Sequence, residues 1–103
     1  MTVSSDIPAQ GTLTGAGTQD TIRTGASTEY VIATFTNYSG STVTLDLWVN
    51  GVADQNRVAP PDMQMLTKET IVLRQKLGNG DTLRAEASAA TAIVYTIELD
   101  SLT

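Results

Sequence analysis

Apolar and polar residues alternate along most of this chain, and the alternation is clearest over residues 42–50. Every second position there carries an aliphatic residue: Val43, Leu45, Leu47 and Val49. Successive side chains of a strand point to opposite faces, so this period predicts a strand with one aliphatic and one mostly polar face. A helical period would scatter the four aliphatic residues around a cylinder.

Eight further segments carry short alternating or β-branched patterns that predict strands. They are residues 11–15, 20–24, 30–37, 55–59, 64–66, 69–74, 82–88 and 92–99. We expect these residues to point inward: Val31, Ala33, Phe35, Ile71, Leu73, Leu83, Ala85, Ala87, Ile93, Tyr95, Ile97 and Leu99. Residues 85–90 are helix formers by propensity, but the alternation on both sides of them favours a strand.

Turn-forming residues separate these segments. The clearest are residues 37–41, the Asn50-Gly51 pair, the two prolines at 60–61 and residues 78–81. Short strands at spacings of about 8–12 residues predict an all-β fold, namely a two-sheet antiparallel β-sandwich of the jelly-roll or immunoglobulin-like type. The length of 103 residues fits one domain, which we place at residues 11–103.

Residues 1–10 carry few apolar side chains and contain Ile7 followed by Pro8. Proline lacks the amide hydrogen and disfavours helix for the residue before it. We therefore expect an extended N-terminal arm, and we name Ile7 and Pro8 as candidates for contact with a neighbouring molecule. The alternative is a frayed terminus.

The net charge of −5 and the isoelectric point near 4.3 limit the classes of partner. Only six Lys and Arg residues are present, and they are scattered along the sequence, which argues against binding a nucleic-acid backbone. The same acidity disfavours anionic membrane surfaces. The apolar runs are too short to span a bilayer and the first residues do not form a signal peptide, so we expect a cytoplasmic origin.

The chain contains no cysteine and no histidine. It therefore has no thiolate and lacks the usual general base and the commonest zinc ligand. The oxygen-rich segments 54–56 and 79–81 lack the ligand spacing of a calcium loop and are interpreted as turns. Glu69 and Glu86 are interpreted as solvated surface residues. We expect no catalytic residues, no metal, no cofactor and no enzymatic activity.

Trp48 is the one large aromatic residue on the otherwise polar face of the strand at 42–50. Either a neighbouring loop folds over this side chain, or it is an anchor in a protein–protein contact, where aromatic residues are enriched. We favour the contact, and we predict an interface formed by Trp48 with Asp46 and Thr44 beside it.

A series of segments gives the chain a family resemblance over roughly residues 20–99. The segments are Asn-Tyr-Ser-Gly at 37–40, the β-branched strand at 42–49, residues 66–73, and Gly-Asp-Thr-Leu-Arg-Ala-Glu-Ala-Ser-Ala at 80–89. With these features the chain resembles the small all-β virion proteins of tailed bacteriophages. That family offers no catalytic residues to transfer.

The resemblance implies a structural subunit of a phage particle, assembled in the host cytoplasm and located in the virion. The most direct expectation is a capsid decoration (cement) protein that stabilises the head surface. Its partners would be the major capsid protein, other virion proteins and further copies of itself. The alternatives are a neck, tail or fibre-associated accessory subunit, or a carbohydrate-binding β-sandwich module.

Overall fold

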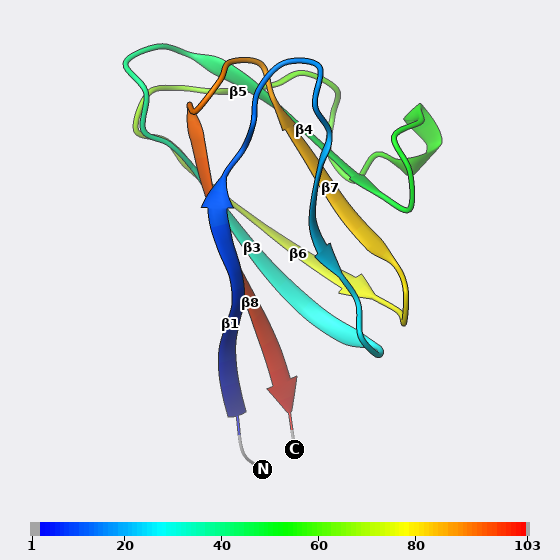
Figure 1. Ribbon diagram of the computed structural model, residues 1–103. Coiled ribbons are helices and arrows are strands. Elements are labelled where there is room, and N and C mark those ends of the chain that lie inside the picture. Colours follow the sequence, from blue (N-terminus) through cyan, green and yellow to red (C-terminus); the bar gives the residue numbers. More distant parts are fainter. Residues whose placement is uncertain (1–2, 103) are drawn as a thin grey trace.

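Eight strands form two antiparallel four-stranded sheets that pack face to face in the computed structural model (Figure 1). The structure describes residues 3–102 of the chain, and side chains over residues 9–99. Sheet A contains, in spatial order, β1 (Val3–Thr12), β8 (Ile93–Leu102), β3 (Glu29–Asn37) and β6 (Thr70–Leu77). Sheet B contains β2 (Asp20–Thr24), β7 (Thr82–Ala87), β4 (Val43–Val49) and β5 (Met63–Met65). The predicted β-sandwich is confirmed.

The strand order follows from a nested pairing of the chain with itself. β1 pairs with β8, β2 with β7, β3 with β6 and β4 with β5. The β3–β8 and β4–β7 pairings then join these hairpin-like pairs into two sheets. This is the connectivity of a jelly roll and not of an immunoglobulin-like sandwich.

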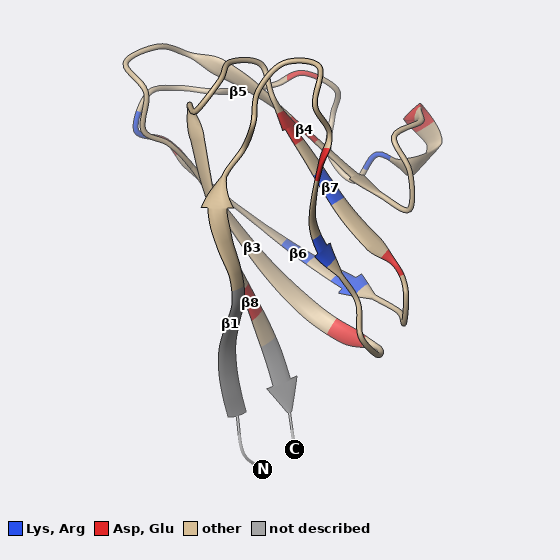
Figure 2. Cartoon of the chain, viewed as in Figure 1, with Lys and Arg blue, Asp and Glu red and all other residues tan. Residues whose placement is uncertain are grey.

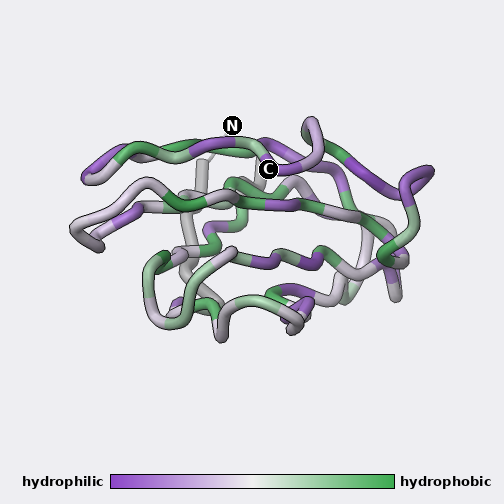
Figure 3. The backbone as a smooth tube through the Cα atoms, turned by 90° about the horizontal axis from the view of Figure 1, so that it is seen from above, coloured by the Kyte–Doolittle hydropathy of each residue, from purple (hydrophilic) through white to green (hydrophobic). Residues whose placement is uncertain are grey.

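The core lies between the sheets and consists of the inward positions that the alternation predicts. Val31, Ala33 and Phe35 of β3 are buried, as are Leu83, Ala85 and Ala87 of β7. The core cluster contains no charged residue, and the charged residues are distributed over strands and turns of both sheets (Figure 2). Seen from above, the two sheets form two layers around this core (Figure 3).

The strand predicted at residues 55–59 is wrong. A single turn of 3₁₀ helix, Asp54–Asn56, occupies its start, and Arg57 then forms an isolated bridge with Trp48. Local side-chain bonds outcompete the ladder here, because Asn56 Oδ1 accepts from the Ala53 amide and Asp54 Oδ1 accepts from Arg57 Nε. This turn is the only helical element among the described residues, and none of them belongs to a helix long and apolar enough to cross a membrane.

Most of the segment expected to be a separate arm, residues 1–10, belongs to the first strand of sheet A. β1 runs antiparallel to β8 from the Val3–Leu102 pair to the Thr12–Val94 pair, with an irregularity between Asp6 and Ala9. The stretch is extended, as the sequence predicts, but its partner is the last strand of the same chain. β8 would otherwise be an unpaired edge, and β1 fills that position.

We expect deletion of residues 1–10 to lower the free energy of unfolding by about 2 kcal/mol, because the deletion removes backbone pairing along β8 and the contact of Ala9 with the core. Urea denaturation of the shortened chain measures this change. An unchanged midpoint would show that the segment is an arm without a structural role in the monomer.

Candidate interaction surfaces

Trp48 lies on the outer face of sheet B, opposite the core, as the alternation requires. Its side chain is nevertheless only 4% exposed, and it does not belong to the core cluster between the sheets. The segment between β4 and β5 folds back over it, with the guanidinium carbon of Arg57 5.2 Å from the centre of the indole ring. The first of the two alternatives for Trp48 is therefore correct, and the exposed anchor that we favoured is not.

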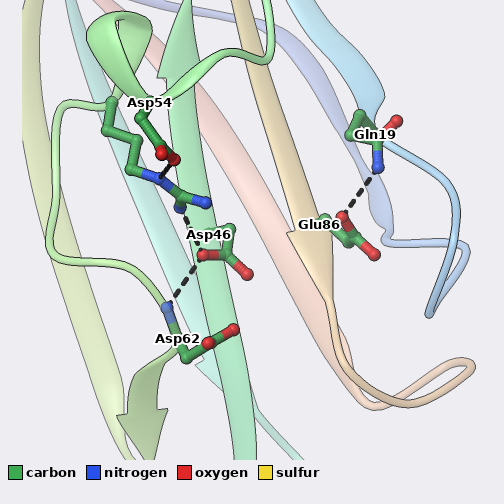
Figure 4. Close-up of polar contacts among 6 residues, drawn as sticks. Gln19, Asp46, Asp54, Asp62 and Glu86 are labelled. Carbon is green, nitrogen blue, oxygen red and sulfur yellow. Dashed lines mark hydrogen bonds and ion pairs between the residues drawn. The ribbon is translucent and has the colours of Figure 1, made fainter.

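Arg57 fixes this segment to the sheet through charged contacts. Its Nη1 donates to Asp46 Oδ1 at 2.7 Å, and its Nε donates to Asp54 Oδ1 at 2.9 Å. The backbone amide of Asp62 donates to the same Asp46 oxygen at 2.9 Å (Figure 4). The hydrogen bond to Asp54, followed by that to Asp46, raises the pKa of Arg57, so the side chain stays charged. Asp46 thus holds both the middle and the end of the covering loop.

A second carboxylate on the same face anchors another loop. Glu86 of β7 stands directly opposite Asp46 of β4 in the antiparallel register (Figure 4). Its two oxygens accept from Gln19 Nε2 and from the amide of Gly17, each at 2.8 Å. Two like charges placed opposite each other destabilise a sheet. The chain offsets this repulsion by giving each carboxylate its own donors from a separate loop.

These contacts correct the predicted interface on β4. Trp48 and Asp46 are buried under residues of their own chain, and Thr44 is half-buried, with its amide donating to Ser88 Oγ at 2.8 Å. The side chains of Ile7 and Pro8 lie outside the described residues. Sequence reasoning missed Arg57, whose position over Trp48 depends on the path of a loop that alternation does not describe.

Two buried nitrogen atoms near this cover have no hydrogen-bond partner among the described residues, Trp48 Nε1 and Arg84 Nε. Trp48 and Arg84 are cross-strand neighbours on β4 and β7. The indole therefore contributes through its apolar ring and its contact with Arg57, and not through its polar atom.

The predicted turn at residues 78–81 joins β6 to β7 and is held by Asp81. The Gly78 amide donates to Asp81 Oδ2 at 2.8 Å, and Asn50 Nδ2 donates to Asp81 Oδ1 at 3.0 Å. The bond from Gly78, and then the bond from Asn50, lower the pKa of the Asp81 carboxyl. Asp81 therefore links two turns at the same end of sheet B.

The depressed pKa of Asp81 gives a sign to the pH dependence of stability. Because the pKa of Asp81 is lower in the folded state, its carboxylate stabilises the fold fully at pH values above the ordinary pKa of 3.8. This stabilisation is lost as the pH falls through the folded-state pKa. We expect Asp81→Asn to flatten the loss of stability below about pH 4. Urea denaturation of both proteins between neutral and acidic pH tests this, and parallel curves would contradict it.

The other acidic residues considered as catalytic or metal-binding groups make hydrogen bonds within turns. Glu69 lies in the turn before β6 and accepts from the Leu66 amide at 2.8 Å, whereas Glu86 lies on β7 of sheet B. Segment 54–56 supplies the 3₁₀ turn. In the part of the chain that the structure describes, no three acidic side chains gather in a way that could hold a metal ion.

The large apolar side chains that are exposed on strands, and not in loops, lie on the outer face of sheet A. Tyr30 and Val72 are 60% and 53% exposed on its outer face, and Leu66 is exposed just before β6. A hollow of about 830 Å³ adjoins Tyr30 and is lined by residues 27–32 and by residues 74–76 of β6, among others. This surface, and not the Trp48 face, is the candidate for contact with another molecule.

Half of the basic residues follow the β6 edge, from the turn before the strand to near its end. Lys68, Arg74 and Lys76 account for three of the six basic residues of the chain, and blue positions mark β6 and the turn before it in Figure 2. Among the described residues their side chains make no hydrogen bond or ion pair, whereas Arg23 pairs with Glu29 and Arg57 with Asp46. Three cations without an ion-pair partner among the described residues therefore follow β6, with Arg74 and Lys76 two positions apart on the strand.

Comparison of the sequence with protein-family models finds no match, and comparison with curated proteins finds no similar sequence.

Proposed function

We propose that this protein is a non-enzymatic structural subunit of a bacteriophage particle, and that it decorates the capsid by binding the major capsid protein and other virion proteins. The observation that carries the proposal is the division of the surface. Loops of the chain cover Trp48 and Glu86 on the outer face of sheet B, while sheet A keeps exposed apolar side chains on its outer face and the eight-residue edge strand β6. A subunit that binds a large assembly through one side needs such a surface.

The jelly-roll connectivity supports this proposal by analogy, because the architecture is used in viral capsid domains. The architecture alone does not determine function, since jelly rolls also occur in lectins. The sequence resemblance to small phage virion proteins favours the first use. A neck, tail or fibre-associated position in the same particle is the alternative within this class.

Binding to phage heads assembled without this chain tests the proposal. We expect the purified protein to bind such heads saturably and to raise their resistance to heat. Attachment to purified necks, tails or fibres, with no attachment to heads, would favour the accessory position. No attachment to any of these particles would contradict the proposal.

One observation favours a second candidate, a carbohydrate-binding module. The exposed ring of Tyr30 borders the hollow next to Glu29, Arg74 and Lys76, and aromatic rings beside polar groups can stack on sugars. A glycan array separates the two candidates, because an assembly subunit is expected to bind no sugar. A specific glycan signal that Tyr30→Ala abolishes would establish the second candidate.

A further inference from the structure

The β6 strand is a long free edge. It has eight residues and pairs only with β3, so its other side has no neighbouring strand among the described residues. Natural sheets normally shorten or cover such edges, because unpaired backbone groups are a template for another strand. An edge of this length can accept an added strand from outside.

The register shows which backbone groups are free. The Asn37 amide donates to the Glu69 carbonyl at 3.0 Å, and Phe35 and Ile71 are the next pair of the same parity. Hydrogen-bonded pairs alternate in an antiparallel ladder, so residues 71, 73 and 75 bond to β3. The alternate residues, 70, 72, 74 and 76, therefore direct their N–H and C=O groups away from the sheet.

The side chains of the same alternate residues define the chemistry of this edge. Arg74 and Lys76 lie on the outer face beside exposed Val72, and Lys68 lies just before the strand. An added strand would place its side chains next to these cations, where opposite charges stabilise a cross-strand pair and like charges destabilise it. The β6 edge of a second copy carries the same cations and is therefore a poor occupant.

We propose that the β6 edge binds an extended, acidic segment of a partner protein, which adds to sheet A as a further strand. Main-chain hydrogen bonds would supply affinity, and Arg74 and Lys76 would select acidic side chains. Tyr30 and Ile32 of β3 pair with Lys76 and Arg74 of β6. They line the adjoining hollow, which an apolar side chain of the partner can enter. This inference deepens the proposed function by naming the chemistry of the partner segment.

Two synthetic peptides test the recognition. In the first, valine and glutamate alternate; in the second, lysine replaces each glutamate. We expect the acidic peptide to bind the full chain at low salt, to bind more weakly as salt rises, and to bind at least about tenfold more tightly than the lysine peptide. Equal binding of the two peptides, or no binding of the acidic one, would overturn the proposal.

Two variants locate the binding on β6. Val72→Pro removes an outward N–H and leaves the β3–β6 bonds intact, so it should weaken acidic-peptide binding about fivefold, while the matched Val72→Thr should not. The double variant Arg74→Glu, Lys76→Glu keeps the backbone and should exchange the preference, binding the lysine peptide instead. Circular dichroism confirms that each variant is folded. Unchanged peptide preference in a folded double variant would overturn the proposal.

The oligomeric state gives a further check. Analytical ultracentrifugation is expected to show that Val72→Pro does not alter self-association. A dimer that this substitution abolishes would overturn the proposal by identifying a second copy as the occupant. If the acidic peptide binds as expected but the protein does not bind phage heads, the result supports the β6 edge site and contradicts only the assignment to the phage particle.

Discussion

The Trp48→Ala variant is expected to lose about 3 kcal/mol of unfolding free energy, the largest effect of any outward-facing substitution in sheet B. The side chain is buried under the loop after β4, so its removal leaves a cavity and takes away the ring on which Arg57 lies. Urea denaturation measures the loss.

Trp48→Phe is the matched control. Phenylalanine keeps an aromatic ring under the loop but loses the pyrrole part of the indole, whose nitrogen has no hydrogen-bond partner among the described residues. We therefore expect it to cost about 1 kcal/mol, well below the alanine variant. If the alanine variant has native stability but binds phage heads poorly, the result would contradict this account and support an exposed interface at Trp48.

The Asn37→Ala variant is expected to lose about 3 kcal/mol, because this fully buried amide makes four hydrogen bonds. Its Nδ2 donates to the carbonyls of Ser41 and Met65 at 2.8 and 3.0 Å. Its Oδ1 accepts from the amide and the hydroxyl of Ser39 at 3.0 and 2.7 Å. The side chain thus joins the end of β3 to the following turn and to β5, and alanine leaves these groups without partners.

Two further variants separate the parts played by Asn37. Ser39→Ala removes only a hydroxyl at the edge of this cluster and should cost about 1 kcal/mol. Asn37→Asp keeps the acceptor but turns a carboxylate toward two carbonyl oxygens, so it should destabilise the neutral-pH protein at least as much as alanine. Thermal unfolding monitored by circular dichroism ranks the three. A smaller effect for Asn37→Ala than for Ser39→Ala would contradict this account.

Period-two alternation was sufficient to predict β3, β4, β7 and β8 together with their inward faces. In β7, the small residues Ala85 and Ala87 favour a helix by propensity, and the period-two alternation together with the turn at Gly80-Asp81 indicated the correct structure. The two-sheet architecture followed because such faces must be buried against one another. The choice of jelly roll over an immunoglobulin-like order was left open, since local sequence does not encode which distant strands pair.

The candidate surfaces were harder to predict for the same reason. The burial of Trp48 depends on Arg57, which lies in a segment whose composition resembled a strand and which forms a 3₁₀ turn instead. The pairing of β1 with β8 joins the two ends of the chain and has no local signal. The cations of the β6 edge did have a local signal, because Lys68, Arg74 and Lys76 lie within nine positions of each other in the sequence. That β6 is an edge strand is apparent only in the folded sheet.

The composition of purified particles tests the central claim most directly. Virions from the phage that encodes this chain can be isolated on a density gradient, and quantitative mass spectrometry then gives the number of copies per particle relative to the major capsid protein. The account predicts that the chain stays with the particles through the gradient at a fixed ratio to the capsid protein. Particles that lack the chain while it remains in the lysate would contradict the account.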